Sequence, residues 1–225
     1  CSANLLQAHA ITSRSWLLAQ LEKSRRVKRQ PLKYHTTVET PESRVRWYDR
    51  EDHELYDVCA DDHCQRYQGI TTVSRPTVKA AVEETHGQVL MHEGRICDAR
   101  FSKSCGGISE PFETVWEPTH FPYLVSVADR DPLVKGPSDV HKEADAQAWI
   151  RNSPESFCHT TDRRVLSQVL PAFDQETTDF YRWRVTYTQA DLAELIRTKS
   201  GIDFGRIVDL VPVERGPSGR ISLLK

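Results

Sequence analysis

Apolar residues return at three- and four-residue intervals from Leu5 to Leu21, and this spacing dominates the start of the chain. The period predicts an amphipathic helix, which must bury one face against another element. Pro31 forbids continuation of that helix, because proline lacks the amide donor and clashes with the preceding turn. We interpret the basic run "EKSRRVKRQPLK" as a solvated helix end or loop rather than a nucleic-acid patch.

Short β-type runs replace the helical period between residues 45 and 130. These runs are VRWYD, LYDVC, GQVLMHEGRIC (with EGR as a hairpin turn), ARFSK and YLVSVAD. Among them, "RPTVKAAVEETHG" predicts a short helix that Gly87 closes.

The later part of the chain is predicted to be mainly helical. Helices are expected in SDVHKEADAQAWIRNS, DRRVLSQVLPAF and QADLAELIRTKSG, a strand in FYRWRVTYT, and a hairpin around GPSG. Helices and strands are mixed without a βαβ rhythm. The predicted fold class is therefore α+β, a mixed sheet with an N-terminal helix and peripheral helices.

Composition sets the class of protein and excludes some partners. A hydrophobic content of 38% and a charged content of 28% are typical of a globular domain, and a net charge of −2 gives no reason to expect nucleic acid. No apolar run approaches the roughly 18 residues that cross a bilayer, and any export signal is expected outside this chain. We expect residues 1–225 to form one domain, cut at both ends, with core motifs in 4–130 and a helical insertion, strand and hairpin in 140–225.

The densest group of potential ligands lies in "DREDHELYDVCADDHCQRYQG". His53, Cys59, His63 and Cys64 fall within twelve residues. Zinc prefers thiolate and imidazole ligands in a tetrahedron, and short spacings allow one loop to supply several of them. The spacing is not that of a standard zinc finger. Residue types alone leave three alternatives open: a metal site, a Cys59–Cys64 disulfide, or two unrelated thiols.

A second group lies in "FSKSCGGISEPFETVW". Gly106 and Gly107 follow Cys105, which indicates a backbone that turns sharply or approaches a ligand closely. A lone Ser-Cys-Gly-Gly is weak support for a nucleophilic cysteine, since such signatures do not transfer between families. We therefore expect Cys105 to be structural, either facing Cys158 or buried as a small apolar group.

Taken in order, these stretches resemble the stage II sporulation protein D (SpoIID) and LytB amidase-enhancer family. "LLQAHAITSRSWLL" is similar to the family's catalytic helix, and "VCADDHCQRYQG" to its Cys-…-His-Cys-Gln-x-Tyr-x-Gly segment. "ARFSKSCGG…E…VW…PYLVSV" is similar to its Ser-x-Cys-Gly-Gly, Glu, Trp and Pro-Tyr-Leu series. The resemblance covers about residues 4–130 and is loose beyond 140. The family's C-terminal Gly-x-Gly-His-Gly-x-Gly-x-x-Gln stretch is absent.

The resemblance implies a cell-envelope or secreted protein that binds peptidoglycan glycan strands. In the family, a lytic transglycosylase cleaves denuded glycan with one glutamate, which donates and then accepts a proton. Counting back from Arg14 places Asn4 at the position of this catalytic glutamate. The amide of asparagine can neither donate the proton nor accept it. The alternative is a non-enzymatic module that binds glycan or activates a cell-wall amidase.

Asn4 itself has a purely structural interpretation, because asparagine is among the best N-cap residues. If the protein is active, another carboxylate has taken over, and Glu110 is the expected substitute. A third alternative is that the start of the sequence is not the native one.

The resemblance also implies site residues. Zinc ligands of the family correspond to His53, Cys59 and Cys64, and a residue required for activity corresponds to His63. The Cys59–Cys64 spacing is one residue shorter than in the sporulation proteins. Candidate substrate-binding residues are Arg14, Gln65, Tyr67, Ser104, Gly106 and Gly107.

Overall fold

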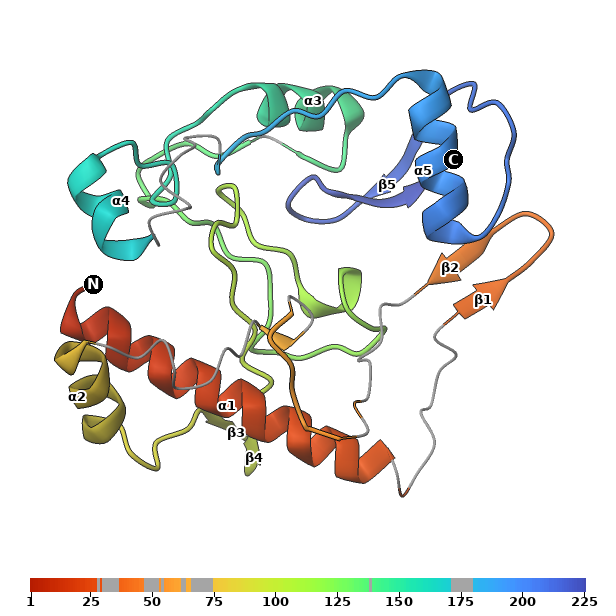
Figure 1. Ribbon diagram of the computed structural model, residues 1–225. Coiled ribbons are helices and arrows are strands. Elements are labelled where there is room, and N and C mark those ends of the chain that lie inside the picture. The colour runs from red at the N-terminus through yellow and green to blue at the C-terminus, as the bar shows by residue number, and fades with distance from the viewer. Residues whose placement is uncertain are drawn as a thin grey trace. The chain divides into compact units, whose positions relative to one another are not determined.

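The structure, a computed structural model, describes residues 1–27, 29, 37–46, 53, 55–61, 64–65, 75–137, 139–170 and 180–225 (Figure 1). Helices and short strands alternate irregularly along it, which confirms the α+β class. In these residues the strands form three separate two-stranded antiparallel sheets, rather than the expected mixed sheet.

The chain divides into two compact units. One comprises residues 1–103 and 115–124, and the other comprises residues 104–114 and 125–225. The assignment of 1–225 to a single domain stays a prediction, because compact units of this size occur within domains as well as between them.

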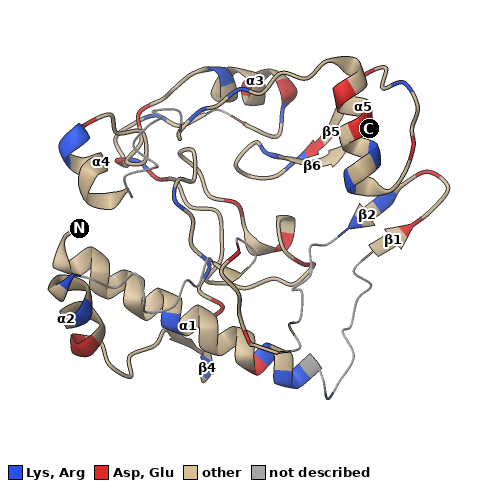
Figure 2. Ribbon diagram, viewed as in Figure 1, with Lys and Arg blue, Asp and Glu red and all other residues tan. Residues whose placement is uncertain are grey.

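Helix α1 (Ala3–Val27) is the longest element of the first unit and contains the whole predicted stretch. The N–H of Leu5 donates to Ser2 Oγ at 3.3 Å, so Ser2 caps the helix. Asn4 lies inside the first turn, and its interpretation as the cap is wrong. The last turn carries Arg25 and Arg26, where helix carbonyls favour positive charge (Figure 2). The basic run is thus a helix end in its described part, as predicted.

Helix α2 (Pro76–Glu84) packs on α1 and begins with its proline at the first helical positions. Trp16, only 2% exposed, and the fully buried Ser15 occupy the centre of the unit. Ser15 Oγ accepts a 2.8 Å hydrogen bond from the N–H of Leu90, which fixes the segment after α2 against α1. The predicted short helix is confirmed.

Two hairpins complete the described strands of the first unit. Strands β1 (Thr37–Glu39) and β2 (Arg44–Arg46) pair with each other, as do β3 (Met91–His92) and β4 (Arg95–Ile96). Glu93 and Gly94, which join β3 to β4, both have positive φ, at 46° and 74°. Two such residues make the tight turn whose twist suits a hairpin, so the predicted EGR turn is confirmed.

The second unit holds the other helices and the last hairpin. Its elements are η2 (Phe112–Thr114), α3 (Glu143–Arg151), α4 (Arg163–Val169), α5 (Gln189–Ser200), β5 (Pro212–Arg215) and β6 (Ile221–Leu224). The three predicted helices and the GPSG hairpin are confirmed. The strand predicted in FYRWRVTYT is wrong, because residues 180–188 are irregular and belong to none of the sheets of the described chain.

Two β-type runs also lack strand structure. LYDVC and ARFSK are irregular, and YLVSVAD contributes only a bridge between Ala128 and Ile108.

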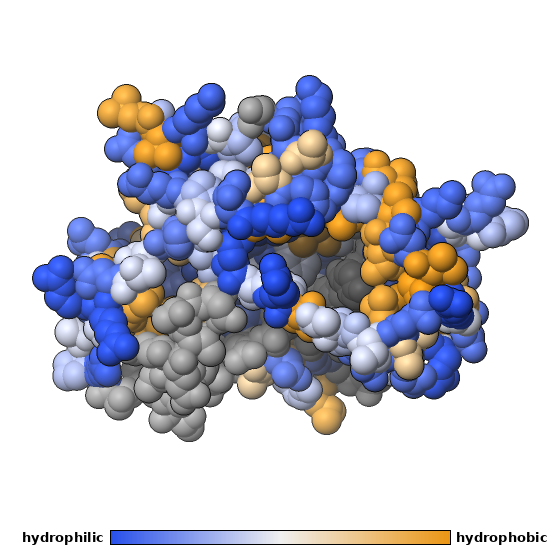
Figure 3. Space-filling model, turned by 90° about the horizontal axis from the view of Figure 1, so that it is seen from above, coloured by the Kyte–Doolittle hydropathy of each residue, from blue (hydrophilic) through white to orange (hydrophobic). Residues whose placement is uncertain are grey.

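The core of the second unit is small and is held partly by polar contacts. Ile108, Val140 and Trp149 form its buried apolar cluster. Arg215, 5% exposed, donates to a carboxylate oxygen of Glu143 at 2.8 Å and so ties β5 to α3. Apolar side chains also reach the surface, as Figure 3 shows for one face. The exposed ones on β6 are Ile221, Leu223 and Leu224.

No helix in the described ranges is both long enough and apolar enough to cross a membrane.

Candidate functional site

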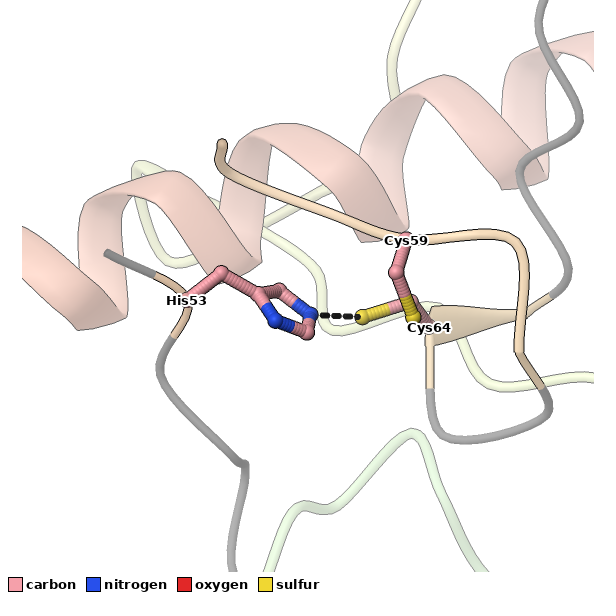
Figure 4. Close-up of side chains that lie close together, drawn as sticks. All are labelled: His53, Cys59 and Cys64. Atoms are coloured by element: carbon pink, nitrogen blue, oxygen red, sulfur yellow. Dashed lines mark hydrogen bonds between the residues drawn. The ribbon is translucent and has the colours of Figure 1, made fainter. Parts of the chain in front are cut away.

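Three of the four predicted soft ligands converge in the first unit. The Nε2 atom of His53 lies 3.2 Å from Cys64 Sγ, and Cys59 joins them so that the three ligand atoms are all within 4.8 Å of one another (Figure 4). His63, the fourth predicted member, lies outside the described residues. The sequence spacing therefore predicted a real convergence of three side chains.

A tight loop brings the two cysteines together. The N–H of Cys64 donates to the carbonyl of Asp61 at 3.1 Å, and the N–H of Asp61 donates to Cys59 Sγ at 3.3 Å. This N–H fixes the position of the Cys59 sulfur, as hydrogen bonds to metal ligands commonly do. Cys64 is buried, and Gln65 after it has a positive φ of 59°. All six cysteines of the chain are thiols in this structure.

The donor set fits zinc. Imidazole and thiolate are the ligands zinc prefers, and three protein ligands with an open fourth position are typical of catalytic rather than structural sites. The ring of His53 also lies against Tyr56, with centroids 4.5 Å apart, which restricts the imidazole orientation. The ion itself remains a proposal.

Asn4 occupies an exposed position in the first turn of α1. Gln7 lies three residues later and is therefore its neighbour on the helix surface. The Nε2 atom of Gln7 donates to Glu84 Oε2 on α2 at 2.6 Å. A carboxylate is thus held next to the helix surface that carries Asn4. Sequence reasoning did not identify Glu84, because only the packing of α2 on α1 brings it there.

Arg14, a predicted substrate-binding residue, is engaged within the protein. Its Nη1 atom donates to the carbonyl oxygens of Thr85 and Gln88, both at 2.8 Å. Thr85 is the C-cap of α2, whose last carbonyls have no partner inside the helix. These contacts give Arg14 a structural role, and its contact with substrate stays a prediction.

The Gly-Gly turn belongs to the second unit. Gly106 and Gly107 have φ values of 69° and 97°, so the sharp turn predicted from the sequence is confirmed. The Nη1 atom of Arg182 donates to the carbonyl of Gly106 at 3.0 Å. A Cβ added at Gly107 would lie 2.8 Å from the Tyr181 hydroxyl, so only glycine fits there. Ser104 Oγ is buried, without a hydrogen-bond partner in the part of the chain that the structure describes.

Cys105 faces Cys158, as predicted, with 3.8 Å between their Sγ atoms. Burial raises the pKa of the Cys105 thiol to about 11, and the nearby Cys158 and Asp129 act in the same direction. A thiol that stays protonated is a poor nucleophile. The structure thus supports the structural interpretation of Cys105.

Glu110, the expected substitute acid, is held inside the second unit. Its carboxylate accepts hydrogen bonds from the N–H of Ser218 at 3.0 Å, from the Ser218 hydroxyl, and from Thr114 Oγ1 at 2.9 Å. Ser218 lies in the GPSG turn, so Glu110 fixes the β5–β6 hairpin. Its catalytic role stays a prediction, and these contacts indicate a structural one.

The predicted site residues are therefore divided between the units. Asn4, Arg14, Gln65 and the three potential zinc ligands belong to the first, and Ser104, Gly106, Gly107 and Glu110 to the second. Tyr67, like His63, lies outside the described residues.

Two family models match the chain. The first, described as Stage II sporulation protein, matches residues 1–92, and the second, described as Domain of unknown function (DUF8618), matches residues 110–225. Neither a curated protein nor a solved structure matches it.

Proposed function

We propose that the first unit, which matches the Stage II sporulation protein model over residues 1–92, has a cell-wall-related role and binds the glycan strands of peptidoglycan. The predicted resemblance to sporulation proteins is confirmed for this N-terminal part. Over residues 110–225 the chain belongs to the DUF8618 family. The DUF8618 family is described as a domain of unknown function, so its match to residues 110–225 indicates no activity.

The proposal depends mainly on the convergence of His53, Cys59 and Cys64 within the matched segment. These side chains come from a loop with few regular elements, and a loop of this kind needs a specific reason to bring soft ligands together. His53, Cys59 and Cys64 would hold one zinc ion. Zinc with an open position supplies a Lewis acid that polarises a bound oxygen.

The residue at position 4 distinguishes a lytic enzyme from a protein that only binds glycan. Lytic cleavage needs a group that first donates and then accepts a proton, and an amide does neither. Loss of such a group is typically worth about 10²–10⁴ in rate, or roughly 3–5 kcal/mol of barrier. With Asn4 at this position, we propose a glycan-binding protein without the family's lytic activity, located in the cell envelope.

A second candidate function is lytic transglycosylase cleavage with a displaced acid. The observation that favours it is the carboxylate of Glu84, which Gln7 holds next to the first turn of α1. Glu84 is exposed, and its carboxylate is already engaged by Gln7. We therefore favour glycan binding over lytic cleavage. A cell-wall amidase is a further proposed partner, in keeping with the amidase-enhancer resemblance.

Co-sedimentation with purified glycan strands tests the binding function. Insoluble peptidoglycan, with and without enzymatic removal of stem peptides, is incubated with the protein. We expect the protein in the pellet, with more of it bound to denuded strands. The double variant Cys59→Ser/Cys64→Ser should lose most of this binding, whereas Cys97→Ala, a buried cysteine outside the ligand group, should retain it. Equal and negligible sedimentation of all three proteins would contradict the proposal.

A further inference from the structure

A second group of soft and hard ligands lies in the other unit, outside the matched sporulation segment. Cys105, Asp129 and Cys158 place a sulfur, a carboxylate oxygen and a sulfur all within 4.8 Å of one another. They come from three separate segments: the Gly-Gly turn, the bridge after Ala128, and the loop before α4. These three residues are separate from the ligand group at His53, Cys59 and Cys64.

The distance between the two sulfur atoms matches that of two thiolates bound to one zinc ion. The two Sγ atoms are 3.8 Å apart. Zinc–sulfur bonds are about 2.3 Å long, so two thiolates on one tetrahedral zinc lie about 3.8 Å from each other. A disulfide requires about 2.0 Å between the sulfurs, a shorter separation than the one observed.

Backbone N–H groups bind the ligand atoms of Cys105 and Asp129, and Cys158 supplies one of these N–H groups. The N–H of Gly107 donates to Cys105 Sγ, and the N–H of Cys158 donates to Asp129 Oδ2 at 3.0 Å. The N–H of Asp129 donates to the carbonyl of Gly107 at 3.0 Å, and that of Phe157 to the carbonyl of Asp129 at 2.9 Å. Donors of this kind orient metal ligands and stabilise the thiolate form.

The charges of the group are also unbalanced without a cation. Two thiolates and a carboxylate so close to one another would repel. In the part of the chain that the structure describes, Arg220 donates to the Cys105 carbonyl and Arg182 to the Gly106 carbonyl, so these two guanidiniums bind backbone oxygens. A divalent cation would convert the repulsion into attraction.

We propose that Cys105, Asp129 and Cys158 form a binding site for a soft divalent cation, Zn²⁺, in the second unit of the chain. Binding releases the two thiol protons, and a water completes the tetrahedron. The ion joins the Gly-Gly turn to the loop before α4. It thereby rigidifies the second unit, whose apolar core is small.

Zinc stoichiometry under reducing conditions tests this site separately from the one at His53. The reduced, metal-free protein is titrated with Zn²⁺ against a competing chromophoric chelator. We expect Cys105→Ser/Cys158→Ser to bind one ion fewer than the wild-type protein. Cys59→Ser/Cys64→Ser is the matched double variant and should retain the ion at Cys105. Because the two counts are independent, failure of either site leaves the other result unaffected.

Three further measurements apply if the double variant folds poorly. Asp129→Asn keeps the acceptor for the Cys158 N–H and removes the charge, so Zn²⁺ affinity should fall at least about 10-fold. Co²⁺ in place of Zn²⁺ should give tetrahedral d–d bands and a thiolate charge-transfer band that Asp129→Asn weakens. Zn²⁺ at 100 times its dissociation constant should raise the melting temperature by roughly 5–10 °C.

Equal ion counts in the wild-type protein and Cys105→Ser/Cys158→Ser would overturn the proposal. So would a Cys105–Cys158 disulfide in the purified protein whose reduction creates no capacity for an additional ion.

Discussion

The guanidinium of Arg14 donates a 2.8 Å hydrogen bond to the carbonyl of Thr85, which closes α2. The same Nη1 atom reaches the carbonyl of Gln88. One side chain of α1 thus satisfies the C-terminal end of its neighbour. This arrangement accounts for an arginine at a position that family resemblance alone would assign to substrate.

Arg14→Met should therefore destabilise the fold and leave glycan binding intact. Methionine keeps the apolar stem but removes the charged donor to the carbonyls of Thr85 and Gln88. We expect the free energy of unfolding to fall by about 1–3 kcal/mol in urea titrations. Arg25→Met, at the exposed end of α1, is the control and should stay near wild type. Unchanged stability with lost binding to glycan strands would instead make Arg14 a substrate ligand.

Ser2 and Asn4 should contribute differently to α1. Ser2→Ala removes the oxygen that accepts the Leu5 N–H and should lower the free energy of unfolding by about 0.5–2 kcal/mol. Asn4→Ala replaces an exposed residue inside the helix with a better helix former, and we expect a change within about 0.5 kcal/mol. Chemical denaturation of both variants measures this. A larger loss from Asn4→Ala would show that Asn4, not Ser2, is the cap.

Cys105 should react slowly with iodoacetamide in the metal-free, reduced protein. Its thiol pKa lies near 11 instead of 9.0, so the thiolate fraction at pH 8 is lower by about 100-fold. Mass spectrometry of peptides labelled over time gives the rates for Cys105 and for the exposed Cys1 in the same sample. The Cys105 rate should rise steadily between pH 8 and 11, because deprotonation is still incomplete. If Cys105 is labelled as fast as Cys1 at pH 8, the structural interpretation is contradicted, and a nucleophilic role for Cys105 is supported instead.

Glu110→Gln should affect the hairpin rather than any chemistry. The amide accepts fewer hydrogen bonds from Ser218 and Thr114 and carries no charge, so we expect a loss of about 1–3 kcal/mol in stability. Glu155→Gln, on an exposed loop, is the matched control. If Glu110→Gln keeps its stability but abolishes an activity on glycan, Glu110 is the displaced acid after all.

Local patterns predicted much of this fold. The period from Leu5 to Leu21 was sufficient for α1, and the EGR and GPSG turns were sufficient for two hairpins, because turn residues fix the chain within a few positions. FYRWRVTYT alternates like a strand, yet a strand also needs a partner, and partner choice depends on tertiary structure. Asn4 was interpreted as a cap because asparagine caps well, but Ser2 supplies the oxygen two residues earlier.

The sequence likewise predicted the site residues that lie close together along the chain, but not those that only the fold brings together. His53, Cys59 and Cys64 were identified because they lie close in sequence and one loop closes them. Asp129 and Glu84 gave no signal, since each meets its partners only through contacts with segments distant in sequence.

Mass spectrometry of products from denuded glycan strands tests the central claim most directly, with the wild-type protein and Asn4→Glu compared. Asn4 lies in the exposed first turn of α1, where the helix N-terminus tolerates a carboxylate, so the variant should fold normally. The account predicts intact strands with the wild-type protein and 1,6-anhydro fragments with Asn4→Glu. Anhydro fragments from the wild-type protein, at a rate that Asn4→Glu does not increase, would contradict it, and Glu84→Gln would then be the next variant to examine.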